Sequence, residues 1–329
     1  MTVLVAGGAG YIGSHAVKAL RAAGQDVVIY DNLCAGHGEV ATLLDVPLEV
    51  GDLRDAARLA SVMRAGRVDA VMHFAALLSV GESVKNPLEY YDNNVVGTLS
   101  VLRAMVDAGA RHLIFSSTAA TFGEPVETPI TEQHPQRPIN AYGETKLTVE
   151  QALPHFERAY GMKWTVLRYF NAAGADPDGV LGEDHDPELH VIPRAIDAAL
   201  GRGTFAIYGD DYDTPDGTCL RDYVHVTDLA SAHLLALEAL RAGRPSAAYN
   251  LGNGRPISVR EVVTSVERVT GRRVPAESAT RRPGDPGVLY ASSERIRREL
   301  GWAPAYEALD VIVDTAFRWR QNHPEGYGA

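Results

Sequence analysis

Tyr142 and Lys146 are the two side chains whose types and spacing best suit acid–base chemistry. They belong to the segment NAYGETK, residues 140–146, which follows a proline-rich loop and leads into apolar residues with helical spacing. Residues four apart on a helix point the same way, so we expect both side chains on one face of a helix capped by Asn140. The plainer alternative is a surface tyrosine beside a solvated lysine, because this spacing is common.

The chemical use of such a pair follows from the tyrosine pKa. With an ordinary pKa of about 10, loss of the tyrosine proton at pH 7 costs roughly 4 kcal/mol. A nearby ammonium, helped by a second cation, can offset a cost of that size. We therefore expect Tyr142 to be poised as a general acid or base.

A glycine-rich turn lies at the start of the chain. The strand-like run at residues 3–6 enters the segment GGAGYIG, residues 7–13, and a helical stretch follows. This order lets the backbone approach a pyrophosphate at the helix N-terminus, although an ordinary turn between strand and helix is the plainer alternative. The next strand-like run ends at Asp31, where a carboxylate binds a ribose diol and repels a 2′-phosphate. The pattern predicts a dinucleotide site that takes NAD rather than NADP.

Apolar strand-like runs alternate with helical stretches through the first half of the chain. This alternation predicts an α/β fold, a doubly wound parallel sheet of the Rossmann type with ligands at the carboxyl ends of its strands. A looser pattern after residue 171 predicts a smaller α/β substrate-binding cap. We expect an NAD-binding domain over residues 1–170, with later returns near 224–254, and an interleaved substrate-binding domain over 171–329. The further runs are expected at 26–30, 48–50, 68–74, 111–115 and 164–169, with a long helix near 87–108.

Composition excludes several kinds of partner. The 329 residues carry a formal net charge of −11 and no basic block, so neither nucleic acid nor an acidic membrane surface is expected to bind. No apolar run approaches the roughly 18 residues of a membrane span. Cys34 and Cys219 are the two cysteines, which favours a reducing, cytoplasmic compartment. The chain enters its strand-like run without a basic leader, so we expect no signal peptide.

His185, in the segment DHD at residues 184–186, is the one candidate metal ligand that stands out. The spacing matches no familiar ligand set, so we expect a solvated loop and no metal. The sequence also holds no G-x-S-x-G segment of the hydrolase type.

Nine segments together compose a known pattern. The chain resembles the extended short-chain dehydrogenase/reductase superfamily and, within it, the UDP-glucose (UDP-galactose) 4-epimerase branch; the likeness covers almost the whole chain. The segments that carry it are VAGGAGYIGSH (5–15), DNL (31–33), VGES (80–83), PLEYYDNN (87–94), LRYFN (167–171), RDYVHV (221–226), YNLG (249–252), RRPGD (281–285) and HPEGY (323–327).

The resemblance implies a role for each site residue. Tyr142 is expected to be the acid/base, Lys146 its partner at the nicotinamide ribose, and Thr118 a hydrogen-bond partner of the reacting hydroxyl. Asp52 is expected near the adenine, but it also suits the cap of a helix over residues 55–64. The expected cofactor-binding residues are Gly7, Gly10, Tyr11, Ile12, Gly13, Asp31, Asn32, Asp52, Leu53, Phe74, Ala75, Ala76, Asn93, Tyr142, Lys146 and Phe170. The expected substrate-binding residues are Thr118, Asn171, His190, Val191, Ala206, Ile207, Tyr208, Arg221, Arg282, Asp285 and Leu289.

The implied reaction interconverts UDP-glucose and UDP-galactose by NAD-dependent oxidation at C4, rotation of the 4-keto sugar and re-reduction on the opposite face. The implied assembly is a homodimer. Two positions depart from the family pattern: Leu78 stands where some members carry lysine, and Phe122 where many carry tyrosine.

Three alternative functions are compatible with parts of the same pattern. Leu289 stands where an aromatic residue is associated with exclusion of N-acetyl sugars and a small residue admits them, so a UDP-N-acetylglucosamine/UDP-N-acetylgalactosamine 4-epimerase or a dual-specificity enzyme stays open. A 4,6-dehydratase is disfavoured, because Ala119 and Ala120 follow Thr118 in place of an acid pair. A non-catalytic NAD-binding regulatory protein is disfavoured by the presence of both Tyr142 and Lys146.

Overall fold

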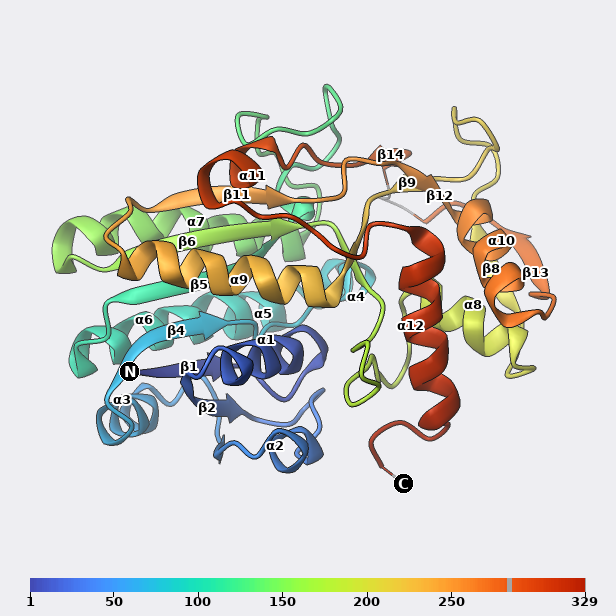
Figure 1. Ribbon diagram of the computed structural model, residues 1–329. Coiled ribbons are helices and arrows are strands. Elements are labelled where there is room, and N and C mark those ends of the chain that lie inside the picture. Colours follow the sequence, from blue (N-terminus) through green and yellow to red (C-terminus); the bar gives the residue numbers. More distant parts are fainter. Residues whose placement is uncertain (283–285, 329) are drawn as a thin grey trace.

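A seven-stranded parallel sheet forms the centre of the protein in the computed structural model, which describes residues 1–282 and 286–328 (Figure 1). Every neighbouring pair of its strands is parallel. From one edge to the other the strands are β11 (Ala247–Leu251), β6 (Lys163–Tyr169), β5 (His112–Thr118), β4 (Val68–His73), β1 (Thr2–Ala6), β2 (Asp26–Asp31) and β3 (Leu48–Val50). The chain reverses its direction of travel across the sheet between β1 and β4, the position where α/β proteins bind ligands.

Alternation along each strand gives the sheet two apolar faces. In β1, Val3 and Val5 belong to one core cluster, whereas Leu4 and Ala6 belong to the other. Because successive side chains of a strand point to opposite faces, a parallel sheet covered on both sides reads as a continuous apolar run. The first face is covered by α1 (Tyr11–Ala22) and α9 (Val226–Arg241), and the second by α3 (Ala56–Ala65), α6 (Gly97–Ala108) and α7 (Ala141–Tyr160).

The helix expected near residues 87–108 has a π-helical middle. It consists of α5 (Pro87–Tyr90), the π-helical turns η1 (Tyr91–Val96) and α6. Inside η1 the Asn94 side chain accepts a hydrogen bond from the Leu77 N–H at 2.9 Å and donates to the Leu77 carbonyl at 3.0 Å. This segment therefore holds the chain that follows β4 against the end of the sheet, and π turns of this kind are frequent at functional sites.

A smaller α/β part faces the carboxyl ends of the strands, towards which the arrowheads of the sheet point in Figure 1. Its own core joins side chains of α8, α10 and α12 to those of β8 and the neighbouring strands. Its helices are α8 (Val191–Ala199), α10 (Val259–Thr270) and α12 (Leu309–Asn322). Its strands are β7 (Asn171–Ala173), β8 (Phe205–Tyr208), β9 (Leu220–Arg221), β10 (Tyr223–His225), β12 (Ile257–Ser258), β13 (Ala276–Ala279) and β14 (Val288–Leu289). The remaining short elements are α2 (Glu39–Leu44), α4 (Val80–Lys85), α11 (Glu294–Leu300) and the 3-10 turn η2 (Ala119–Thr121).

The predicted fold class is confirmed, including a small α/β part beside a doubly wound parallel sheet. The predicted boundary at residue 170 falls between β6 and β7, and β11 returns to the sheet within the predicted range 224–254. Helix α12, which packs in the core of the small part, was not predicted. The division of the chain into two functional domains stays a prediction.

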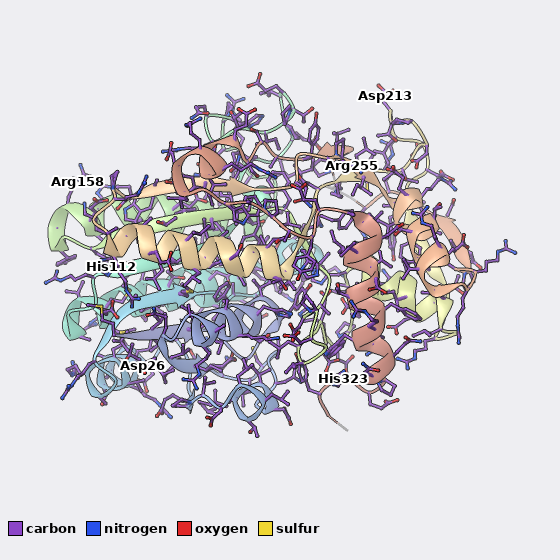
Figure 2. The ribbon with its side chains drawn as sticks, in the orientation of Figure 1. Asp26, His112, Arg158, Asp213, Arg255 and His323 are labelled. Atoms are coloured by element: carbon purple, nitrogen blue, oxygen red, sulfur yellow. The ribbon has the colours of Figure 1, made fainter. Side chains whose placement is uncertain are left out.

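Figure 2 shows the two ends of the molecule through its labelled side chains. Asp26 and His112, which begin β2 and β5, lie with Arg158 at the end away from the small part, and Asp213, Arg255 and His323 lie at the other. Within the described residues, no helix is both long enough and apolar enough to cross a membrane.

A buried ionic network ties α7 to β5 and β6. Arg168 on β6 donates from Nη2 to Glu150 Oε2 on α7 at 2.6 Å, and Glu150 Oε1 accepts a short hydrogen bond from Ser117 Oγ on β5. Gln136 Nε2 donates to Glu150 Oε2 at 3.0 Å. The Arg168 and Glu150 side chains are less than a tenth exposed. Breaking a buried pair on one side leaves a desolvated charge, so this network fixes the position of α7 against the sheet.

We expect Glu150→Gln to lower the free energy of unfolding by about 3–5 kcal/mol, the usual cost of removing one partner from a buried ion pair. Denaturant titration followed by circular dichroism measures this. The matched control is Glu144→Gln, on an exposed position of the same helix, with an expected change below about 1 kcal/mol. Equal effects of the two substitutions would contradict the assigned role of Glu150.

Candidate active site

A cavity of about 1010 Å³ lies where the carboxyl ends of the strands meet the small α/β part. Its wall takes residues from the glycine turn, from the ends of β2, β5 and β6, from the start of α7, and from β9 and β14 of the small part. A hollow of this size is at the upper end of the range for small-molecule sites. It has room for an extended ligand together with a second one.

The start of α7 brings Tyr142 and Lys146 to the cavity wall. Asn140 caps the helix as predicted, with its Oδ1 accepting from the Gly143 N–H at 2.9 Å. A Cβ on Gly143 would stand 2.4 Å from the Ala120 carbonyl oxygen. The absence of a side chain at Gly143 therefore lets α7 lie directly against the turn that follows Thr118.

Lys146 carries a buried ammonium group. Its Nζ donates to the Ser116 carbonyl at 2.9 Å and lies 5.0 Å from the centre of the Phe115 ring. Burial lowers the pKa of Lys146 to about 7, while the charge of Glu150, one turn further along α7, raises it. The ammonium is held by the sheet rather than by solvent, and it titrates near neutral pH.

Tyr142 lies next to Thr118 at the end of β5. Burial raises the pKa of Tyr142, and a hydrogen bond with Thr118 lowers it, with a net rise. The expectation that Lys146 depresses this pKa is therefore not met by the side chains of the protein alone. A further positive charge at the phenol is needed to make it a base at neutral pH.

The glycine turn has the geometry of a phosphate-binding loop. Gly7 has φ +79°, and a Cβ on it would stand 2.5 Å from the backbone nitrogen of Ala75. A Cβ on Gly13 would stand 2.1 Å from the Gly7 carbonyl oxygen, so glycine there allows close packing of α1 on the turn. Gly10, the N-cap of α1, provides no capping side chain. The first N–H groups of α1 thus remain available to an anion at the cavity wall.

Asp31 closes the turn at the end of β2. Its two oxygens accept from the backbone N–H groups of Ala9 at 3.0 Å and Leu33 at 2.9 Å. These bonds orient the carboxylate beside the cavity, which Asp31 and Asn32 both line. Burial raises the pKa of Asp31, while hydrogen bonds from backbone N–H groups lower it. The turn, the uncapped helix and this carboxylate together fit the pyrophosphate and adenosine ribose of a dinucleotide.

The opposite wall of the cavity presents two arginines. Arg221, on β9, is buried, and Arg282 stacks over the Tyr208 ring with its guanidinium carbon 4.0 Å from the ring centre. The arginine hydrogen bond lowers the pKa of Tyr208. Leu289, on the neighbouring β14, also lines the cavity. Two guanidinium groups on one wall suit a phosphorylated ligand.

Most residues predicted for the site line this one cavity. Five described residues predicted to bind ligand, Gly13, Asp52, Ala206, Ile207 and Tyr208, do not line it, although Tyr208 contacts Arg282. Asp285 lies outside the described residues. The predicted residues that do line it are Gly7, Gly10, Tyr11, Ile12, Asp31, Asn32, Leu53, Phe74, Ala75, Ala76, Asn93, Thr118, Tyr142, Lys146, Phe170, Asn171, His190, Val191, Arg221, Arg282 and Leu289.

Asp52 is not in the cavity wall. It forms an ion pair with Arg54, Nη2 to Oδ2 at 2.6 Å, and the helix cap that it was considered for is provided by Asp55, which accepts from the Arg58 N–H. Of the two departures from the family pattern, Leu78 lines the cavity, whereas Phe122 is buried against the ring of His134.

The sequence predicted a solvated loop at His185, but the structure shows a side chain that is mostly buried. Its side chain is 18% exposed and lies beside Glu183, Glu188 and His190. Asp184 points elsewhere and accepts a hydrogen bond from the Tyr327 N–H at 3.0 Å. The two aspartates that flank His185 in sequence are therefore not its partners in this cluster.

Ser116 and Tyr169 line the cavity and were missed as site residues. Their hydroxyl groups form a short hydrogen bond with each other between the ends of β5 and β6. Tyr169 lies in the segment at residues 167–171 that carried the family resemblance, and Ser116 is two residues before Thr118 on the same strand. Alternation along β5 was the signal available for Ser116, because residues two apart face the same side.

This arrangement defines a class of protein: a doubly wound α/β fold with a dinucleotide-type turn and a Tyr-x-x-x-Lys pair facing one cavity. The model of the NAD dependent epimerase/dehydratase family matches residues 3–252. The chain belongs to this family.

Three of the similar proteins show how close the relationship is. The UDP-glucose 4-epimerase of Halalkalibacterium halodurans is 52% identical over 328 residues, 99% of this chain and 98% of the relative. The crystal structure of UDP-glucose 4-epimerase from Bifidobacterium longum in complex with NAD+ and UDP has a TM-score of 0.94 and 38% identity, and the match covers 99% of this chain and all of that one. The UDP-Glc/GlcNAc 4-epimerase of Campylobacter jejuni has a TM-score of 0.84 and 39% identity, with 98% of this chain and 99% of that chain covered.

Because the Lys146 ammonium group is buried, we expect its removal to stabilise the folded protein. Because the folded pKa of Lys146 is about 7, below the unfolded value of about 10.4, the unfolded chain binds more protons between these pH values. The free-energy cost of burying the charged Lys146 side chain is therefore fully present below pH 7 and decreases as the pH rises towards 10. We expect Lys146→Met, in protein freed of nucleotide, to raise the free energy of unfolding by roughly 1–4 kcal/mol at pH 7.

Thermal unfolding of the nucleotide-free proteins at pH 7 and pH 9.5 measures this gain. The difference between Lys146→Met and wild type is expected to shrink at the higher pH. Lys163→Met, at a solvated position beside Glu157, is the control and should show no such pH dependence. A loss of stability in Lys146→Met at both pH values would overturn the assignment of a buried, strained charge.

Proposed function

We propose that this protein is an NAD-dependent UDP-glucose 4-epimerase that interconverts UDP-glucose and UDP-galactose. The observation that carries the proposal is the position of Tyr142, Lys146 and Thr118 on the wall of one cavity that also takes in the glycine turn. Membership of the family and the full-length relatives named above support the same reaction.

NAD is the cofactor that this cavity fits. The Gly7–Gly13 turn and the uncapped start of α1 are suited to its pyrophosphate, and Asp31 to its adenosine ribose. Lys146 is proposed to hydrogen-bond the nicotinamide ribose, and Asn93 and Phe74 line the same cavity. When bound, the nicotinamide supplies hydride chemistry, oxidising the sugar at C4 and reducing the ketone again from the opposite face.

Tyr142 is proposed to move the proton in both half-reactions. Its phenol oxygen takes the proton of the C4 hydroxyl as that carbon is oxidised and returns it on reduction, while Thr118 holds the reacting oxygen. Burial keeps the pKa of Tyr142 high in the protein alone. The positive charge of Lys146 and that of an oxidised nicotinamide favour the phenolate, so the base is generated where the cofactor is in place.

We propose that the protein binds its substrate mainly through the nucleotide part of the UDP-sugar. Arg221 and Arg282 are suited to the diphosphate, and Asn171, His190 and Val191 to neighbouring parts of the UDP-sugar. Inversion requires the 4-keto sugar to turn over while the nucleotide stays bound. Binding energy from the remote diphosphate can hold the ligand without contacts that fix the ring.

A second candidate function is the 4-epimerisation of UDP-N-acetylglucosamine and UDP-N-acetylgalactosamine. Leu289 lines the cavity at the position that the family resemblance links to N-acetyl sugars, and its side chain is intermediate in size. The Campylobacter jejuni relative is a UDP-Glc/GlcNAc 4-epimerase. Parallel assays with both pairs of sugars separate the two candidates.

Tyr142→Phe is expected to lower the rate of conversion of UDP-galactose to UDP-glucose by at least about 100-fold, because the acid–base group is lost. Product analysis by ion-exchange chromatography measures the rate. UDP-N-acetylgalactosamine, run in parallel, tests the second candidate, and its conversion at a comparable rate would establish dual specificity.

The control for this substitution is Tyr160→Phe, at the exposed C-terminal end of the same helix, with an expected rate close to wild type. Circular dichroism and the amount of NAD that copurifies show whether Tyr142→Phe still folds and binds cofactor. Near-normal turnover in a folded Tyr142→Phe variant would remove the proposed mechanism.

We also propose that two copies of the chain form a homodimer. The segment from α5 to α6 exposes a row of apolar side chains, with Leu88 82% exposed, Val96 47% and Leu99 41%. An exposed apolar surface of this kind is typical of a protein–protein interface. Sedimentation equilibrium is expected to give the mass of two chains, and Leu88→Lys/Val96→Lys that of one. A single-chain mass for the wild-type protein would exclude the dimer.

A cytoplasmic location is part of the same proposal. Cys34 is exposed, Cys219 is buried, and the two form no disulfide in the described structure. Thiols of this kind suit a reducing compartment.

A further inference from the structure

Four side chains from one short loop bring their metal-ligating atoms together outside the catalytic group. Glu183, His185, Glu188 and His190 lie between β7 and α8, and one ligand atom from each lies within 4.8 Å of all the others. Their spacing, E-x-H-x-x-E-x-H, is contained in eight residues. Two imidazoles and two carboxylates form a donor set that suits a divalent transition metal, with zinc the best match.

The distances between donors agree with the edges of a coordination tetrahedron. His185 Nδ1 lies 3.3 Å from Glu183 Oε1 and 3.6 Å from Glu188 Oε2. Zinc–ligand bonds of about 2.0–2.2 Å put tetrahedral donors roughly 3.3–3.6 Å apart. His190 Nδ1 and Glu183 Oε1 lie closer than this, so a small rotation of one side chain completes the set.

The donors converge without hydrogen-bonding one another. Glu183 Oε1, His185 Nδ1 and His190 Nδ1 are buried, and none has a hydrogen-bond partner within the described structure. The Glu183 side chain is 5% exposed. These atoms lie at ion-pair distance from one another but without hydrogen-bond geometry, and an ion bound between them would give each of them a partner.

A small cavity adjoins the cluster and gives that group room. It measures about 30 Å³, and Glu183, His185 and Glu188 are among the residues that line it. A hollow above roughly 10–15 Å³ can hold one water-sized particle. The space therefore accommodates a single ion and leaves no room for an organic ligand.

The loop also holds its donors in place. Glu188 Oε1 accepts from the backbone N–H groups of Leu189 at 2.7 Å and His190 at 2.8 Å, which leaves Oε2 for a cation. The His185 ring lies edge-on to the Tyr11 ring at 6.2 Å between centres. Outer contacts that orient the ligands in this way are a regular feature of metal sites.

We propose that Glu183, His185, Glu188 and His190 bind one divalent transition-metal ion, with Zn²⁺ preferred, as a structural site on the wall of the active-site cavity. His185 and His190 both line that cavity, and Val191, which follows His190, begins α8. The contact of the His185 ring with Tyr11, the first residue of α1, links this loop to the glycine turn. Four protein donors close the coordination shell, so the ion takes no part in the proposed reaction.

A cluster of ion pairs without metal is the competing interpretation. Burial lowers the pKa of His185, but its close interactions with Glu183 and Glu188 raise it to about 9. Two imidazolium and two carboxylate groups would then balance in charge. Two neutral imidazoles, two carboxylates and Zn²⁺ balance equally well, so charge alone does not separate the two and binding has to be measured.

The test uses the full-length protein as purified, with its bound nucleotide, after chelator treatment and desalting. Calorimetric titration with ZnCl₂ is expected to give one site per chain with a dissociation constant in the micromolar range or below. Added Zn²⁺ is also expected to raise the unfolding temperature, as it does whenever a ligand binds the folded state alone. Added Co²⁺ is expected to give the visible absorption of a tetrahedral nitrogen- and oxygen-ligated ion.

Two ligand substitutions and one control make the result specific. His185→Gln and Glu188→Gln are each expected to weaken Zn²⁺ binding at least 10-fold and to abolish the rise in unfolding temperature. His155→Gln, on the exposed side of α7, is expected to bind Zn²⁺ as wild type does. Either ligand variant alone suffices if the other fails to fold.

Substoichiometric Zn²⁺ binding by the wild-type protein, or unchanged binding by a folded His185→Gln or Glu188→Gln variant, would overturn the proposal and leave an ion-pair cluster only. These readouts do not use turnover. Failure of the metal proposal is therefore distinguishable from failure of the proposed epimerase function.

Discussion

The ammonium of Lys146, buried at the end of the sheet, is the charge on which the architecture of the active site depends. It is held by the Ser116 carbonyl and the Phe115 ring, and the pair of Glu150 and Arg168 lies beyond it. These groups are distributed over α7, β5 and β6. The same buried polar contacts therefore fix the position of α7 and replace water around the Lys146 ammonium group.

Burial of the Lys146 ammonium group lowers the stability of the folded protein, and it also lowers the pKa of that group. A lysine with a pKa near 7 is a poor stabiliser of the fold, but in the proposed mechanism its ammonium group is the partner of a ribose hydroxyl. Tyr142 shows the complementary case, because its surroundings keep it protonated until more positive charge arrives. In the proposed mechanism, formation of the base therefore depends on occupation of the cavity by the cofactor.

The fold class was predictable because each strand and helix of the sheet domain has a recognisable local sequence pattern. Continuous apolar runs such as residues 3–6, the glycine turn and the capped start of α7 each depend on residues close together in the chain. The role of Asp52 at the adenine stays a prediction, because the structure shows its carboxylate paired with Arg54 at the surface and not in the cavity wall.

The parts that escaped prediction depend on pairs far apart in sequence. The hydrogen bond between Ser116 and Tyr169 forms because β5 and β6 are neighbours in the sheet, and no local pattern indicates it. The cluster around His185 is not evident from its neighbours in sequence, Asp184 and Asp186, because the fold of the loop brings Glu183 and Glu188 to the two histidines instead. Helix α12 packs on residues that precede it by more than a hundred positions, such as Ile196, and its own sequence did not distinguish it.

The order of the strands has a consequence for how the chain is made on the ribosome. The edge strand β11 pairs with β6, and α9 covers the apolar face of the sheet, yet both follow the segment of the small part between residues 171 and 222. While that intervening stretch is being translated, β6 has one bare edge and the side chains beneath α9 face water. Such a surface invites pairing with other nascent chains. The growing polypeptide is thus most vulnerable to aggregation before its last sheet strand has emerged, so this stage of biosynthesis is the one at which chaperones would have most to protect.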